Sequence, residues 1–134
     1  MAFTGGCMCG AIRYECDGKP LTMFQCHCTD CQHISGGPFT ATVYVRLESY
    51  KITKGTPRYY FTDSEMGGKN KRGFCGDCGS RISGGETETG IGINAGSLDD
   101  PSWFSAHMHI FASDAQPWDV IDPAIPQFET YPPM

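Results

Sequence analysis

Seven of the eight cysteines in this 134-residue sequence stand in three tight groups, and this grouping is its strongest chemical signal. The groups are Cys7-Met8-Cys9, Cys26-His27-Cys28-Thr29-Asp30-Cys31 and Cys75-Gly76-Asp77-Cys78, with Cys16 left alone. Thiolates one or two residues apart can point at a common centre about 2.3 Å from each sulfur, as tetrahedral zinc requires. The same closeness strains a disulfide, because bridged Cα atoms usually lie about 4.4–6.8 Å apart. The grouping therefore favours metal binding, and a disulfide framework is the lesser alternative.

Seven thiolates cannot fill two closed sites of four ligands each. Two pairs that lie far apart in the sequence form a sensible closed structural site, namely Cys7/Cys9 and Cys75/Cys78. The remaining ligands would be Cys26, Cys28 and Cys31. Three protein ligands with an open fourth position are typical of catalytic zinc. In the alternative reading all groups are structural, and the second site is closed by His27, His33 or Cys16.

Other polar residues near these cysteines have more than one possible role. Asp30 lies between two cysteines, where its carboxylate could accept a proton, support a ligand or cap a turn. His27 could be a ligand or a proton shuttle, although strand alternation would point it away from the metal. His107 and His109 share a face of a predicted strand, and without a third partner we expect a surface or packed pair.

Charge and composition exclude several classes of function. The formal charge is −5 and the isoelectric point is about 5.2, so we expect neither nucleic acid nor an anionic membrane as a partner. The sequence has neither a recognisable export signal nor an apolar run of about 18 residues, so we expect a cytoplasmic protein. The only basic cluster is Lys69-Asn70-Lys71-Arg72, which is expected to be either a solvated turn or a contact for an anionic substrate. A looser basic set is Lys51, Lys54 and Arg58.

The pattern of residues predicts a single, mainly β domain over residues 1–134. Glycine and proline number 17 and 9 and punctuate short runs rich in β-branched and aromatic residues, which is typical of antiparallel strands. Strands are predicted at 11–15, 23–26, 39–46, 50–53, 58–62, 72–74, 81–83, 90–94 and 107–112. A short helical turn is predicted at 98–103, where Asp100 could cap it and Pro101 could occupy its first position. The proline-rich residues 116–134 are predicted to be extended.

Aromatic residues give two further expectations. Large rings are usually buried, so most are predicted to lie in the core: Tyr44, Tyr59, Tyr60, Phe61, Phe74, Trp103, Phe104 and Phe111. Phe39 is the first choice for a ring beside the second metal. If the C-terminal segment docks on the domain, its anchors are Trp118, Phe128 and Tyr131.

The cysteine motifs, in order, resemble those of the glutathione-dependent formaldehyde-activating enzyme family, also called the centromere protein V (CENP-V) domain family. The resemblance rests on Gly6-Cys7-Met8-Cys9-Gly10, on Cys26 to Cys31 followed by Ser35-Gly36, and on Arg72-Gly73-Phe74-Cys75-Gly76-Asp77-Cys78-Gly79. It continues through Gly96 to Pro101, His109-Ile110-Phe111, Trp118 and Phe128-Glu129.

The resemblance implies an antiparallel β-tent fold with two zinc ions per chain. Structural zinc would be held by Cys7, Cys9, Cys75 and Cys78, and catalytic zinc by Cys26, Cys28 and Cys31. The implied activity is that of a carbon–sulfur lyase run in reverse, which joins glutathione to formaldehyde; the partners are then a small thiol and an aldehyde. Asp30 is the candidate proton acceptor. Two alternatives stay open: a non-catalytic zinc-stabilised interaction module, and a thiol redox sensor.

Overall fold

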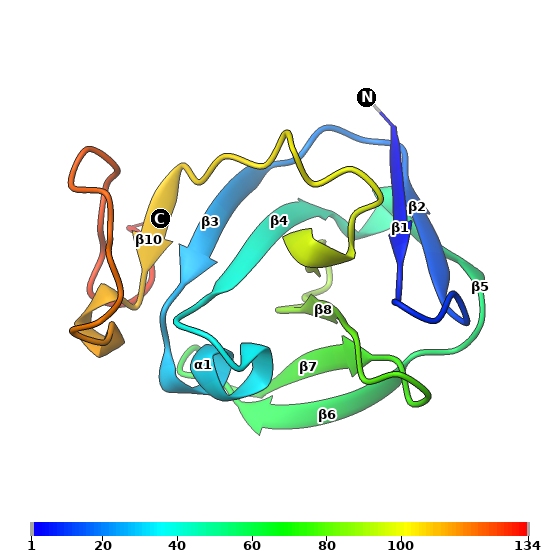
Figure 1. Ribbon diagram of the computed structural model, residues 1–134, viewed down its shortest axis with the longest axis horizontal. Helices are drawn as coiled ribbons and strands as arrows, with labels where there is room; N and C mark the ends of the chain where they lie inside the picture. Colours follow the sequence, from blue (N-terminus) through cyan, green and yellow to red (C-terminus); the bar gives the residue numbers. More distant parts are fainter. Residues whose placement is uncertain (1, 134) are drawn as a thin grey trace.

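Two β-sheets make up the body of the protein in a computed structural model that describes residues 2–133 (Figure 1). The three-stranded sheet has the order β1-β2-β5, formed by β1 (Phe3–Gly6), β2 (Arg13–Cys16) and β5 (Tyr50–Lys54). The seven-stranded sheet comprises β10 (Met108–Ile110), β3 (Thr22–Cys26), β4 (Thr40–Arg46), β9 (Gly90–Asn94), β8 (Arg81–Gly84), β7 (Lys69–Phe74) and β6 (Arg58–Asp63), in that order. Neighbouring strands are antiparallel except β10 and β3, which run parallel. The predicted mainly β, antiparallel fold class is confirmed.

The nine predicted strands correspond to β2 through β10, and the sequence pattern missed β1. Its residues, Phe-Thr-Gly-Gly, have little intrinsic strand preference because two are glycine. The strand forms because it pairs with β2, where Phe3 lies opposite Cys16 and Gly6 opposite Arg13. Tertiary pairing therefore overrides the weak local propensity.

The helical elements were poorly predicted. α1 (Thr29–Ser35) was not expected; at seven residues it is too short to show a helical period, and it ends at Gly36 with φ 70°. The 3-10 helices are η1 (Leu47–Ser49), η2 (Ala95–Ser97) and η3 (Ala112–Asp114). The helical turn predicted at 98–103 is a non-helical turn that follows η2, although Asp100 does accept a 3.0 Å hydrogen bond from the Ser102 N–H there.

The main core fills the space between the two sheets. Val43 and Val45 of β4 lie opposite Ile93 and Ile91 of β9, and these four side chains are at most 2% exposed. Tyr14 of β2 joins the same cluster from the small sheet. Burying one such aliphatic side chain stabilises the fold by about 1.5–3 kcal/mol. This core holds the two sheets in fixed positions, which in turn fixes the turns that carry the cysteines.

Three aromatic residues of β6 contradict the prediction that they are buried. Tyr59, Tyr60 and Phe61 are 40%, 63% and 54% exposed. β6 is an edge strand that pairs only with β7, so its side chains lie at the rim of the large sheet rather than between the sheets. Local sequence pattern does not reveal which strand will lie at an edge.

The C-terminal residues run beside β10, where Figure 1 shows the orange and red part of the chain. The His109 and Phe111 N–H groups donate to the carbonyls of Pro126 and Thr130 at 2.9 and 3.0 Å, and the Phe128 N–H donates back to the His109 carbonyl. Phe128 packs against a small apolar cluster at this end of the molecule. Trp118, expected as an anchor, is 65% exposed and does not fill that role.

Candidate metal centres

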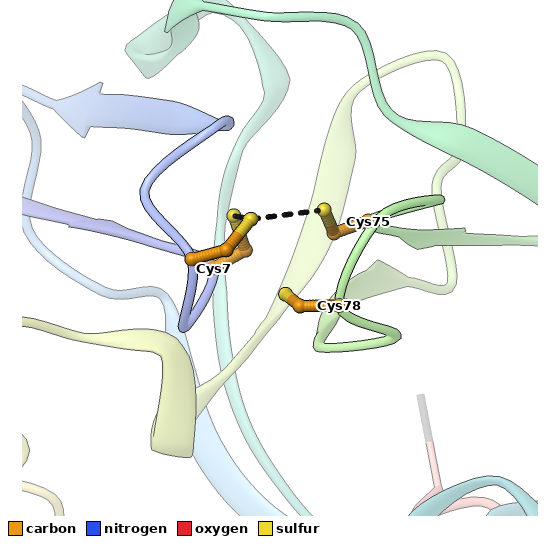
Figure 2. A group of neighbouring side chains, drawn as sticks. Cys7, Cys75 and Cys78 are labelled. Carbon is orange, nitrogen blue, oxygen red and sulfur yellow. Dashed lines mark hydrogen bonds between the residues drawn. The ribbon is translucent and has the colours of Figure 1, made fainter.

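The first sulfur group joins the small sheet to the large one. Cys7 and Cys9 lie in the turn between β1 and β2, and Cys75 and Cys78 lie in the turn between β7 and β8 (Figure 2). All four sulfurs lie within 4.8 Å of one another. The Cys7–Cys9 and Cys9–Cys75 sulfur separations are 3.6 and 3.8 Å. Four ligands about 2.3 Å from one tetrahedral ion would lie about 3.8 Å apart, so this group has the geometry of a closed metal site.

The backbone of both turns supports this arrangement. Gly10 and Gly79 each have φ of +80°, a conformation that L side chains rarely adopt, and each follows the second cysteine of its pair. The Ile12 N–H donates to the Cys7 sulfur at 3.2 Å. The two turns also contact each other directly, because the Met8 N–H donates to the Ser80 hydroxyl at 2.9 Å. The turns are therefore held in place by hydrogen bonds beside the sulfurs.

Hydrogen bonding also favours the ionised form of one of these thiols. The side chain and backbone of Ser80 lower the pKa of Cys78 to about 5. The thiolate is the form that binds a metal.

The second sulfur group lies where β3 ends and α1 begins. Cys26 is the last residue of β3, Cys28 is the N-cap of α1, and Cys31 lies in the first turn of that helix. Their sulfurs lie within 4.8 Å of one another. Cys26 and Cys31 are buried, 8% and 6% exposed, whereas Cys28 is half-buried. The Cys28 sulfur accepts a 3.3 Å hydrogen bond from the Cys31 N–H, so one atom both caps the helix and belongs to the group.

The thiols of the second group differ in their pKa. Hydrogen bonds from Cys26 and Cys28 lower the pKa of Cys31, and Thr40 and the positive charge of Arg72 lower it further. Contacts with the thiols of Cys28 and Cys31, together with burial, raise the pKa of Cys26. Cys31 is therefore the first of the three to ionise, and a metal ion binding here would displace the remaining protons.

Among residues 2–133, no fourth cysteine, histidine or carboxylate completes the second group. The three residues that were considered for that position lie elsewhere. His27 hydrogen-bonds His109, at 2.9 Å between the ring nitrogens Nε2 and Nδ1. Cys16 is buried in the main core. His33 lines a cavity of about 480 Å³ that does not include any of the three cysteines. The described part of the chain thus brings together four sulfurs in one group and three in the other.

Asp30 lies in the first turn of α1, but it does not cap the helix because the Cys28 sulfur does so. Its side chain is 49% exposed, and one carboxylate oxygen lies 3.9 Å from an Arg72 nitrogen. The Arg72 side chain is only 9% exposed, and its Nε donates to the Thr62 hydroxyl at 3.1 Å. The Asp30 carboxylate therefore lies near the Arg72 guanidinium, whose positive charge acts on Cys31.

The predicted basic cluster is divided by strand alternation. Arg72 lies opposite Tyr60 in the β6–β7 register, whereas Lys71 lies opposite Phe61, on the other face of the sheet. The Lys71 ammonium lies 4.3 Å from the centre of the Tyr59 ring and 3.6 Å from the Glu86 carboxylate. Only Arg72 of this cluster is close to the second group.

The sequence analysis did not place Tyr131 or Phe111 beside the second group. Tyr131 contacts Phe111 edge to face, with 4.9 Å between ring centres, and Phe111 packs in the same cluster as Cys26 and Cys31. Burial raises the pKa of Tyr131, and the charges of Cys26 and Cys28 add to that effect. No spacing in the sequence signals such contacts, since they depend on where the C-terminal segment docks. Phe39 packs on the ring of His27, which lies between Cys26 and Cys28, with 5.3 Å between ring centres.

A family model described as "Glutathione-dependent formaldehyde-activating enzyme" matches residues 2–114, which include all seven grouped cysteines. The chain belongs to this family. A crystal structure of a Rhodobacter sphaeroides protein has a similar fold, with a TM-score of 0.60 and 18% sequence identity over 92% of this chain and 98% of that one. No curated protein matches this chain. The resemblance seen in the cysteine motifs is thereby confirmed.

No helix among residues 2–133 is long and apolar enough to cross a membrane.

Proposed function

We propose that both sulfur groups bind zinc, two ions per chain. All seven ligands are thiolates, and sulfur-rich tetrahedral sites are typical of zinc, as they are of iron–sulfur centres. The sulfur separations of 3.6 and 3.8 Å in the first group fit zinc–sulfur bonds of about 2.3 Å. With four protein ligands, the first ion would be structural and would join the two sheets. With three, the second would be the reactive one.

At the second site we propose addition of a small thiol, such as glutathione, to an aldehyde such as formaldehyde. Cys26, Cys28 and Cys31 would hold the zinc, and its charge would favour the thiolate form of a thiol bound beside it. In the overall reaction a carbon–sulfur bond forms, the carbonyl π electrons move to oxygen, and that oxygen takes up a proton equivalent to the one lost by the thiol. The reaction needs neither an oxidant nor a reductant.

We assign the proton transfer to Asp30. Its carboxylate is half-exposed and so is open to solvent, and it lies in the first turn of α1 between two of the ligands. A half-exposed carboxylate can accept the proton of an incoming thiol and return it to the product oxygen. The nearby Arg72 guanidinium would hold the carboxylate in place.

Charge bears on which thiol is accepted. Filling both sites removes seven thiol protons and adds two dications, which moves the formal charge from −5 to about −8. Glutathione is anionic near neutral pH, so its binding requires a local positive charge. Arg72 is the buried cation beside Cys31 and is the residue best placed to provide that charge.

The observation that carries this proposal is a group of three convergent sulfurs to which no fourth protein ligand is added among the described residues. The test is to measure formaldehyde consumption and zinc content of the purified protein, with and without glutathione. We expect two zinc ions per chain, glutathione-dependent consumption, loss of activity when a chelator removes the weaker ion, and recovery when zinc is restored.

Other results would favour the other functional classes. Two tightly held zinc ions without activity towards any thiol and aldehyde would indicate an interaction module. One zinc ion together with oxidised Cys26, Cys28 and Cys31 would indicate a redox sensor.

A further inference from the structure

A chain of buried polar side chains lies behind the second sulfur group. His27, which stands between the ligands Cys26 and Cys28, is 0% exposed. Its Nδ1 lies 2.7 Å from an Asp119 carboxylate oxygen, and its Nε2 lies 2.9 Å from His109 Nδ1. The Asp119 side chain is only 5% exposed. Three polar groups from distant parts of the sequence are thus buried in contact with one another.

The contact between Asp119 and His27 requires a shared proton. Among the described residues, neither of the two atoms has another hydrogen-bond partner, and the ring N–H is not well aligned with the oxygen. Two bare lone pairs at 2.7 Å would repel each other, and a buried polar atom without a partner is costly. A proton therefore lies between these atoms, and a small rotation of the ring or the carboxylate would align it.

The order of protons along the chain follows from which of these atoms can donate and which can accept. An ionised Asp119 accepts from His27 Nδ1–H, which leaves His27 Nε2 as an acceptor. The partner nitrogen, His109 Nδ1, must then carry a proton and donate to it. Burial, together with the nearby His27 ring, lowers the pKa of His109, which favours the neutral form of that ring. The opposite order would require a protonated carboxyl group.

The backbone of His27 is fixed as well. Its N–H donates to the Ile110 carbonyl at 3.0 Å, and its carbonyl accepts from Gln32 Nε2 at 2.7 Å. The ring contact with Asp119 is therefore an additional restraint on a loop that carries a ligand on either side. A shift of the His27 backbone would also shift the two cysteines that are bonded to it on either side.

Asp119 lies beyond residue 114, where the family match ends. Its segment is attached to α1, because Gln116 Nε2 donates to Gln32 Oε1 at 2.9 Å and the Asp119 N–H donates to the Gln116 carbonyl at 3.0 Å. The same segment thus contacts both the helix and the loop that supply the second group.

We propose that Asp119 is a positioning residue for the second metal site, acting through His27, and that the C-terminal segment is part of that site. The proposal rests on the proposed function in so far as the second group binds a metal. The role of Asp119 is to accept the His27 Nδ1 proton, which fixes the ring and with it the directions of the Cys26 and Cys28 sulfurs.

The test compares three variants of the full-length chain. Asp119→Leu removes the acceptor while keeping the same branched arrangement of non-hydrogen atoms, whereas Asp119→Asn keeps an acceptor oxygen and removes the charge. Asp122→Asn is the matched control, since Asp122 is an exposed acid of the same segment whose Oδ1 accepts from Ala124 N–H at 2.9 Å. Each protein is loaded with Co²⁺, and the affinity and thiolate-to-cobalt absorption of each site are followed during competition with a chelator.

We expect Asp119→Leu to weaken the second site by about 10- to 100-fold and to alter its absorption, while the first site is unchanged. Asp119→Asn and Asp122→Asn should both behave like the unmodified protein. Unaltered affinity and absorption at the second site of Asp119→Leu would overturn the proposal, as would equal losses in the leucine and asparagine variants.

Nitrogen-15 NMR of the unmodified protein gives a second test, which applies even if the leucine variant does not fold. We expect the Nδ1–H tautomer at both His27 and His109; an Nε2–H tautomer at His27 would overturn the proposed proton order. Failure of this proposal is distinguishable from failure of the proposed function. A protein that binds cobalt at both sites and shows this tautomer, but has no activity towards a thiol and an aldehyde, would support the positioning role of Asp119 and contradict only the proposed reaction.

Discussion

Replacement of Cys28 separates two roles that the structure gives to one sulfur atom. The Cys28 sulfur belongs to the second group and also caps α1 by accepting from the Cys31 N–H at 3.3 Å. Serine is among the preferred N-cap residues, whereas alanine cannot accept that hydrogen bond. Cys28→Ser therefore removes the thiolate and keeps the cap, while Cys28→Ala removes both.

The two variants should differ in stability but agree in metal content and activity. Loss of an N-cap costs about 0.5–2 kcal/mol, so we expect Cys28→Ala to be about 1 kcal/mol less stable than Cys28→Ser. For a chain of this size that corresponds to about 3–5 °C in Tm. The neutral sulfur of the unmodified protein is itself a weak acceptor. Both variants should bind one zinc ion instead of two, and glutathione-dependent consumption of formaldehyde should fall by at least about 100-fold.

The assay measures zinc per chain, initial rates of formaldehyde loss and thermal unfolding for both variants. Cys16→Ala is the matched control, because Cys16 belongs to neither sulfur group; it should keep two zinc ions and its activity. If Cys28→Ser kept two ions and the full rate, the assignment of the second site would be wrong. If the two variants had equal Tm values, the capping role would be wrong.

Three further predictions concern the core and the charge beside the second site. Burial raises the pKa of Tyr14 to about 12 from an ordinary value of 10, so its contribution to stability is complete below pH 10 and is lost as the pH rises through about 12. The difference corresponds to about 3 kcal/mol. Urea unfolding as a function of pH should show that the Tyr14→Phe variant does not lose this stability at high pH; identical pH profiles for the variant and the unmodified protein would contradict the prediction. A Cβ added at Gly5 would clash with the Tyr14 hydroxyl and the Ser97 carbonyl oxygen, so Gly5→Ala should lower the free energy of unfolding by about 1–3 kcal/mol. Gly96→Ala is the control, because a Cβ there meets no atom within 4 Å, and it should not lower that free energy. Arg72→Gln should raise the KM for glutathione more than the KM for uncharged 2-mercaptoethanol, and equal changes for the two thiols would show that the guanidinium does not recognise substrate charge.

The parts of the site that could be predicted from the sequence are those encoded by near neighbours. Cys75 and Cys78, for example, lie close together in the chain, so a single turn brings their sulfurs together. The sequence of that turn is therefore enough to predict that the two sulfurs are neighbours. The strands β2 to β10 were predictable for a similar reason, because short β-branched and aromatic runs between glycines and prolines are typical of strands.

The parts that could not be predicted depend on tertiary docking. The burial of Arg72 beside Cys31 and of Asp119 beside His27 follows from sheet order and from the path of the C-terminal segment. Neither is visible in residue spacing. The exposure of Tyr60 has the same origin, since only the sheet order shows that β6 lies at an edge.

The central claim is that the chain holds two metal ions, one with four sulfur ligands and one with three and a free position. Cadmium-113 NMR of the cadmium-loaded protein tests it most directly, because the resonance position depends on the number of sulfur ligands. We predict two resonances of equal area, one unaffected by glutathione and the other shifting when glutathione is added. A single resonance, or two resonances that both remain unchanged in excess glutathione, would contradict this account.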